Sequence, residues 1–267
     1  MKKNMPKKRS TAQMPVIMMF FPICLALIFS TVWSGHAFGQ SAKLVLNTSY
    51  SSPITSPDNS GFLDLLYKEL FGRLNIPFEI QALPAERCLT NANEGIDDGD
   101  VCRIADLVKS YTNLVRTTEP VMQYQMVLFS RTAQFKVSGP ESLKTYDVGI
   151  VTGWKIIERN TTLHRSRIML DSAEQLFQML DQGRVEVAVI ERTVGMEMVK
   201  KLRIAGVHIL SPPLLTGEWY LYLHKRHAAL IPRIDSELRT MKKDGSYDRI
   251  RREVLGRYEQ GQAPGIR

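Results

Sequence analysis

The amino-acid sequence predicts an α/β protein of two lobes, each built on a mostly parallel sheet flanked by helices. Short apolar runs of strand length alternate with amphipathic patterns of helical period along the chain, and this order is typical of parallel sheets. The alternation occurs twice, because the pattern restarts after Ser138-Gly139-Pro140. The length of 267 residues is sufficient for two lobes of roughly 100–150 residues each.

The first run contains four predicted strands and two predicted helices. Residues 61–74 place their apolar side chains on one helical stripe. A second helix is expected over 84–94, with Pro84 early in the helix, where the missing N–H of proline costs little. The strands are predicted at 43–46, 77–83, 98–104 and 121–130.

The second run repeats the same alternation. Ser172 is the expected N-cap of a helix that ends before Gly183. Strands are predicted at 147–151, 167–170, 185–190, 207–210 and 218–224, and helices at 153–159, 172–181, 192–204, 228–243 and 246–257. Residues 259–267 are expected to form a frayed tail.

The N-terminus has the layout of a secretory signal peptide over residues 1–39. Basic residues precede an apolar run from Met14 to Trp33, and Ala37 and Gly39 match the small-x-small rule for cleavage before Gln40. An uncleaved membrane anchor is the alternative, because the run is almost long enough to span a bilayer. Cleavage predicts a periplasmic protein in an oxidising compartment.

The net charge of +8 depends strongly on this leader. Residues 1–39 hold five basic residues and no acidic one, which leaves 30 basic and 27 acidic residues, a net charge of +3, in the remainder. Such a balance gives no reason to expect a nucleic-acid partner. The sequence also contains no phosphate loop, no dinucleotide-binding fingerprint and no nucleophile elbow, so we expect no cofactor. His224 and His227 are spaced like two metal ligands, but no third ligand is visible, so we expect no metal.

Two cysteines, Cys88 and Cys102, lie beyond the leader. A helix start and the end of the following strand share one edge of a β-α-β sheet, so a disulfide between them is possible. Export favours that disulfide on redox grounds. Two separate buried thiols are the alternative.

Several segments together resemble the extracytoplasmic solute-binding proteins of family 3, the amino-acid-type substrate-binding components of ABC importers, which have the type II periplasmic binding fold. The resemblance covers nearly all of residues 43–258, and it depends on the order and spacing of segments that are individually weak. The segments are Leu44–Tyr50 (first strand and its loop), Gly61–Leu66 ("GFDVDL"), Gly95–Asp98 ("GKxD"), Val148–Gly153 ("VGVxxG"), Ser172–Glu186 ("SxEEALxALxxGRVDA"), Leu221–Lys225 ("iavrKgn") and Met241–Ile250 ("mkaDGtydkI").

The resemblance implies how the lobes are assembled. The first lobe would hold residues 43–129 and 219–258, and the second lobe would hold 130–218. A ligand would lie in the cleft between them, at the carboxyl ends of the strands. The implied partner is the membrane permease of an ABC importer, and the protein is expected to be a monomer.

The resemblance also suggests ligand-binding residues, although one family motif is missing. Amino-acid-binding members carry Thr-x-x-Arg after the third strand, and the stretch 109–113 lacks it. Arg103 at the end of the third strand and Arg87 at the start of the preceding helix are the replacements that we expect to bind a carboxylate. Pairing of both arginines with nearby acids is the alternative.

Three further residues complete the expected site. Tyr50 occupies the position of the aromatic residue in the family's first loop. Trp154 follows Gly153 at a helix start that faces the cleft in the family, although a core or surface tryptophan is an equal alternative. Glu191 stands where members hold the ligand ammonium, and its alternative is an exposed acid at a helix start. These departures favour a small polar or anionic, amino-acid-like metabolite.

Two other functions remain as alternatives to a non-enzymatic solute-binding protein. An extracytoplasmic sensory module would be favoured if the N-terminal segment stays as an anchor. An enzyme similar to the cyclohexadienyl dehydratases, which share the fold, would need an acid or base in the cleft, and Glu191 is the only candidate. Fold analogy alone does not decide among them.

Overall fold

The computed structural model describes residues 43–259. Its helices and strands alternate as the sequence predicts, with ends that differ by a few residues. The strands are β1 (Leu44–Thr48), β2 (Phe78–Ala82), β3 (Gly99–Arg103), β4 (Leu114–Arg116), β5 (Met122–Ser130), β6 (Asp147–Val151), β7 (Ser166–Leu170), β8 (Val187–Glu191) and β9 (His208–His224). The helices are α1 (Phe62–Leu74), α2 (Ala85–Glu94), α3 (Lys155–Asn160), α4 (Ala173–Asp181), α5 (Arg192–Leu202), α6 (Ile231–Lys243) and α7 (Ser246–Glu259), with 3₁₀ turns at Ala105–Lys109, Pro140–Leu143 and Lys225–Leu230.

The strands form two parallel groups joined by two antiparallel strands. The order across the whole sheet is β2-β1-β3-β9-β5-β8-β6-β7, and β4 also pairs with β9. β1 is parallel to β2 and β3, whereas β6 is parallel to β7 and β8. This arrangement confirms the predicted α/β fold class.

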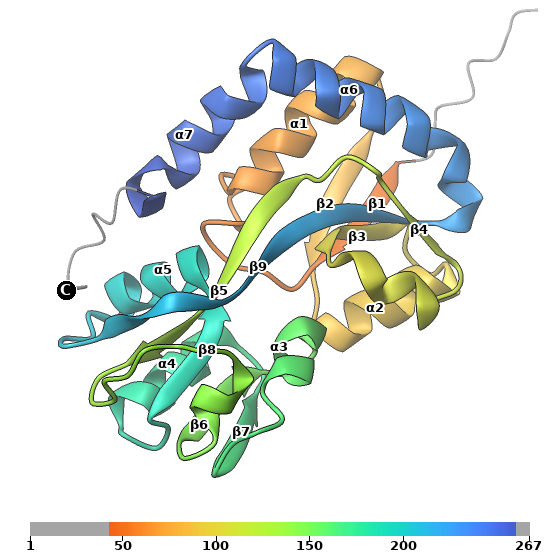
Figure 1. Cartoon of the computed structure of the whole chain (residues 1–267). Coiled ribbons are helices and arrows are strands. Elements are labelled where there is room, and N and C mark those ends of the chain that lie inside the picture. Colours follow the sequence, from red (N-terminus) through yellow and green to blue (C-terminus); the bar gives the residue numbers. More distant parts are fainter. Residues whose placement is uncertain (1–42, 260–267) are drawn as a thin grey trace, which may run out of the picture. The chain divides into compact units, whose positions relative to one another are not determined.

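The long strand β9 takes part in both groups. It pairs with β5 up to Trp219, and with β3 and β4 from Tyr220 onward, so it runs through the middle of the fold beside β5 (Figure 1). β5 pairs with β9 along its length and with β8 over Met126–Phe129. The lobe boundary at residue 129 stays a prediction.

The prediction of two separate strands at 207–210 and 218–224 is wrong, because β9 is continuous. The register shifts opposite Val127 of β5, where residues 211–214 form a bulge. Pro212 and Pro213 lie in this bulge, and proline is accepted there because the ladder needs no N–H from it.

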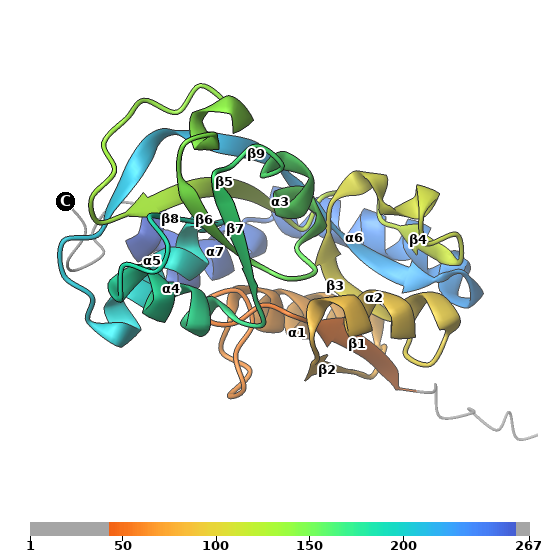
Figure 2. The same cartoon turned by 90° about the horizontal axis from the view of Figure 1, so that it is seen from below.

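Helices cover each group of strands separately. α1, α6 and α7 pack against one another over the first group, and α4 and α5 pack on β5, β6 and β8 of the second (Figures 1 and 2). Ser172 caps α4 as predicted, since its hydroxyl accepts the Gln175 N–H at 3.2 Å. Each group thereby has a hydrophobic core on its helical side.

One buried carboxylate fixes the chain as it enters the crossing strands. Asp235 of α6 accepts hydrogen bonds from the backbone N–H groups of Thr118 and Glu119 and from the Thr118 hydroxyl, at 2.7–3.1 Å. The side chain is buried, so these charge-assisted bonds hold the start of β5 firmly on the first lobe.

Two predictions concern segments beyond this part of the chain. The signal peptide at 1–39 and, apart from Glu259 at the end of α7, the tail at 259–267 lie outside the described residues. Within residues 43–259, no helix has both the length and the apolar character needed to cross a membrane.

Candidate functional site: the cleft between the lobes

Three of the five predicted binding residues come together where the two groups of strands face each other. Tyr50 lies two residues beyond the end of β1, Arg103 is the last residue of β3, and Trp154 directly precedes α3. All three line one small cavity. They therefore meet at the carboxyl ends of parallel strands, where open α/β sheets bind ligands.

The cavity has a volume of about 20 Å³, which is room for about one water molecule. Aromatic rings close it: the Tyr50 ring lies 4.9 Å from that of Trp154 and 4.7 Å from that of Trp219, measured between ring centroids. The lining residues are Tyr50, Leu89, Arg103, Ile104, Leu107, Met126, Trp154, Lys155, Ile156 and Trp219.

Arg103 is a buried cation with a partner of its own. Its Nη2 lies 2.8 Å from Oδ2 of Asp100, and its Nε donates to the same oxygen at 2.8 Å. Nη2 also donates to Ser49 Oγ and to the Ala85 carbonyl, both at 3.3 Å. The structure therefore combines the two expectations for Arg103, since it lines the cleft and also pairs with a nearby acid.

The electrostatics of this pair keep Arg103 charged. Burial by itself would lower the pKa of the guanidinium, but the Asp100 carboxylate more than offsets burial, and the pKa lies above its ordinary value. Burial raises the pKa of Asp100, and Arg103 opposes that rise. A fixed guanidinium of this kind can bind a carboxylate through two parallel hydrogen bonds.

Trp154 fills the space between the lobes. The side chain is only 4% exposed, yet its indole Nε1–H has no hydrogen-bond partner among the described residues. An unpaired buried N–H is costly, so this donor is available to an acceptor that enters the cleft. The backbone N–H of Gly153 is already used, because it donates to Glu158 Oε1 at 2.6 Å.

The two lobes touch beside this tryptophan. Lys155 of α3 forms an ion pair with Glu86 at the start of α2. Gly153 packs directly on α2, since a Cβ atom placed there would lie 2.6 Å from the Cβ of Ala85. The cleft is therefore closed by contacts between α2 and the segment that begins α3.

We expect Gly153→Ala to hold the lobes apart. Gly153 has a φ of +84° as well as the close approach to Ala85, whereas Gly183 has a φ of +68° and open space around it. Gly183→Ala should cost only the left-handed conformation, about 1–2 kcal/mol. Small-angle scattering should give a larger radius of gyration for Gly153→Ala alone, and equal radii for the two variants would contradict this role of the α2 contact.

The other two predicted residues lie elsewhere. Arg87 is exposed on α2 and does not line the cavity. Glu191 is buried and is the N-cap of α5, where Oε2 accepts the N–H groups of Thr193 and Val194 and the Thr193 hydroxyl. Burial raises the pKa of Glu191. The alternative for Glu191, an exposed acid at a helix start, is therefore correct in position but wrong in exposure. Ligand contacts by Arg87 or Glu191 stay predictions.

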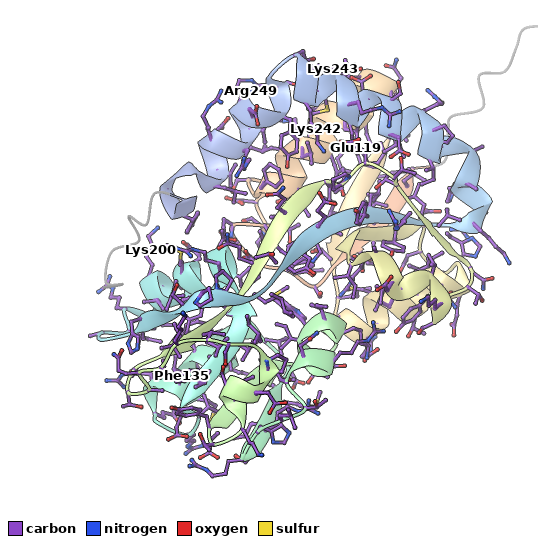
Figure 3. The ribbon with its side chains drawn as sticks, in the orientation of Figure 1. Glu119, Phe135, Lys200, Lys242, Lys243 and Arg249 are labelled. Carbon is purple, nitrogen blue, oxygen red and sulfur yellow. The ribbon has the colours of Figure 1, made fainter. Side chains whose placement is uncertain are left out.

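A larger cavity of about 1040 Å³ lies beside the crossing strands. Side chains alternate along β5 and β9, so Met126 and Trp219 face the small cavity while Gln125 and Glu218 line the large one. Residues of α6 and α7 form another wall, and there Lys242 lies 2.6 Å from Glu119 (Figure 3). This cavity lies between α7 and the start of α5, on the side of β5 and β9 that faces away from the small cavity.

The predicted Cys88–Cys102 disulfide is wrong for this structure, because both thiols are free and buried. Cys88 Sγ is turned toward the Leu83 carbonyl oxygen, 3.3 Å away, and Cys102 is enclosed within β3. The redox argument for the bridge carried no information on side-chain direction. The alternative of two separate buried thiols is the observed one.

Both thiols are expected to resist alkylation in the native protein. Burial raises the pKa of Cys88 to about 12 and that of Cys102 well above its usual value, so the reactive thiolate does not form at neutral pH. Iodoacetamide should modify both only after unfolding in guanidinium, as read by peptide mass mapping. A disulfide-linked peptide pair from the native protein would contradict the free thiols.

Within residues 43–259, no three His, Cys, Asp or Glu side chains gather closely enough to hold a metal ion together. The sequence reasoning also missed residues that line the cleft, notably Met126, Lys155 and Trp219. Trp219 lies on a crossing strand, and its position opposite Met122 becomes apparent only once the strand pairing is known. Lys155 directly follows Trp154 in the sequence, and this neighbouring position could have indicated that it also lines the cleft.

No known family model matches the chain. An uncharacterised protein of Shewanella oneidensis is 25% identical over 211 residues, which cover 73% of this chain and 76% of that protein. Among solved structures, an ancestral arginine-binding protein bound to glutamine has a TM-score of 0.68 and 22% identity, with 80% of this chain and 97% of that chain covered.

Two further solved structures have similar scores. A histidine kinase sensor domain with similarity to periplasmic binding proteins has a TM-score of 0.70 and 16% identity, with 81% of this chain and 97% of that chain covered. The substrate-binding protein of an amino-acid ABC transporter has a TM-score of 0.67 and 14% identity, with 80% and 99% covered. The chain has the two-lobed fold of the periplasmic binding proteins. In this fold the cleft lies between the lobes, and the small cavity lined by Arg103 and Trp154 lies there.

Proposed function

We propose that this protein is a periplasmic solute-binding protein that captures a small anionic, amino-acid-like solute for an ABC importer. The observation that carries the proposal is the meeting of Tyr50, Arg103 and Trp154 from both lobes around one cavity in the cleft. A guanidinium supplies the charge for a carboxylate, and the unpaired indole N–H supplies a second donor.

Binding requires the lobes to separate, because the closed cavity holds only about 20 Å³. The crossing strands are the hinge in this proposal, and the large cavity lies on the side away from the cleft. A rotation that separates α2 from α3 would bring the walls of the large cavity closer together. The empty space of that cavity therefore gives the two lobes room to rotate about the hinge. The ligand would then occupy space that the Trp154 ring now fills against Tyr50.

A thermal-shift screen tests the proposal. The purified protein would be heated with amino acids, polyamines, di- and tricarboxylates, and aromatic and aliphatic acids. A ligand at a hundred times its Kd adds about 2.7 kcal/mol, which is roughly 5–10 °C for a protein of this size. A shift by carboxylates supports the proposal, and a flat response from folded protein across the whole panel contradicts it.

A sensory ligand-binding module is the second candidate, favoured by the similarity to a histidine kinase sensor domain. N-terminal sequencing of the protein from its native membrane and periplasmic fractions separates the two. A soluble form that begins at Gln40 supports the importer role, and a membrane-bound form that keeps residues 1–39 supports the sensor. The enzyme alternative has no such support, since no Asp, Glu or His side chain lines the small cavity.

A further inference from the structure

The charged side chains that line the closed cleft are both cations. These cations are Arg103 and Lys155, and the remaining eight lining residues are Leu, Ile, Met, Tyr or Trp. No carboxylate is among the described residues that line it. A ligand carboxylate therefore has partners in this cleft, while a ligand ammonium group has no counter-charge there.

Three acids near the cleft already have their own partners. Asp100 is fully buried and accepts hydrogen bonds from Arg103 and from the Cys102 N–H. Glu86 pairs with Lys155 across the lobes. Glu191 caps α5 and lines the large cavity. Asp100 or Glu191 could hold an ammonium group only by leaving the group that it now neutralises or caps. Separation of α2 from α3 would release Glu86 and Lys155 together.

The walls of the cleft suit an apolar body. The rings of Trp219, Tyr50 and Trp154 form a continuous row of contacts, with the Tyr50 centroid 4.7 Å from that of Trp219 and 4.9 Å from that of Trp154. Such rings favour apolar or aromatic partners. Arg103 already lies over the Tyr50 ring, 5.9 Å from its centroid, so this face has a cation of its own and a second one would be repelled.

We infer that the ligand is a monocarboxylate with an apolar aromatic or branched aliphatic body and no ammonium group. This inference rests on the proposed function and narrows its solute class. The carboxylate binds Arg103 and the Trp154 N–H, and the apolar body lies between the rings. An amino acid with the same body binds more weakly, because its ammonium group loses water and gains no carboxylate.

Matched pairs of compounds test the inference by isothermal calorimetry on the purified full chain. The pairs are 3-phenylpropanoate with L-phenylalanine, indole-3-propanoate with L-tryptophan, and 4-methylpentanoate with L-leucine. Within a pair, body and carboxylate are the same and only the amino group differs. We expect the acid without the amino group to bind at least tenfold more tightly in the pair that binds best. Glycine betaine is included as a quaternary ammonium probe.

The outcomes separate this inference from the proposed function. Equal or tighter binding of the amino acids, or of glycine betaine, overturns the inference and leaves a solute-binding protein. Binding only by other members of the thermal-shift panel, such as polyamines or dicarboxylates, does the same. Absence of binding by every compound in both experiments overturns the proposed function, and the inference falls with it.

Discussion

Replacing Arg103 by methionine is expected to lower the free energy of unfolding by about 3–5 kcal/mol. The reason is the partner that remains: Asp100 is fully buried and has Arg103 as its ion-pair partner, so Arg103→Met leaves a buried charge uncompensated. Urea unfolding followed by tryptophan fluorescence measures the loss. Arg87→Met is the matched control, because Arg87 is exposed on α2, and it should change stability by less than about 0.5 kcal/mol.

A double variant separates the two roles of Arg103. Adding Asp100→Asn to Arg103→Met removes the stranded charge and should restore most of the lost stability. It should not restore ligand binding, which we expect to be at least a hundredfold weaker in both variants. A double variant that stays as unstable as the single one would argue against the buried pair. If either variant binds the ligand as tightly as the natural protein does, Arg103 is not a ligand-binding residue.

Shortening Trp154 to alanine is expected to cost about 3–5 kcal/mol, the usual cost of deleting a buried aromatic side chain. The ring packs on Tyr50 and is nearly inaccessible, so its removal leaves a space between the lobes. Trp154→Phe keeps an aromatic ring there and removes the unpaired indole N–H. Because that N–H is costly when it is unpaired, the phenylalanine variant should be nearly as stable as the natural protein without ligand.

Ligand affinity distinguishes a binding role of Trp154 from a purely structural one. If the indole N–H donates to the ligand carboxylate, Trp154→Phe should bind about 10- to 100-fold more weakly, as expected for a lost hydrogen bond to a charged group. Calorimetry on the natural protein and the variant measures this ratio. Unchanged affinity together with unchanged stability would show that Trp154 only fills space.

Local sequence patterns were sufficient for most elements of the fold. The apolar stripe of α1, the Ser172 cap of α4 and the short apolar run of β8 are visible in the sequence because each depends on residues within one turn or one strand. The short strand β4 (Leu114–Arg116) was missed, since it exists through its pairing with the distant β9. The bulge of β9 was misread for the same reason, because Pro212 and Pro213 are tolerated only opposite that stretch of β5.

The candidate site was predicted in part. Tyr50, Arg103 and Trp154 were found because the ends of parallel strands meet at one edge and because the resemblance placed them there. Arg87 is exposed on α2 and does not line the small cavity, and its contact with a ligand stays a prediction. Side-chain direction also decided the cysteines, which are near each other in sequence and remain free thiols.

The sequence by itself determined the alternation of strands and helices and the two runs, because these depend on periodicity and on the order of elements. The resemblance to a known family pointed to Tyr50, Arg103 and Trp154 at the cleft edge. Only the tertiary structure decided that Arg103 shares its charge with Asp100, that Glu191 caps α5, and that the indole N–H of Trp154 is left unpaired. Hydrogen-bond partners depend on which side chains meet across the lobes, and long-range contacts of this kind leave no periodic signal along the chain.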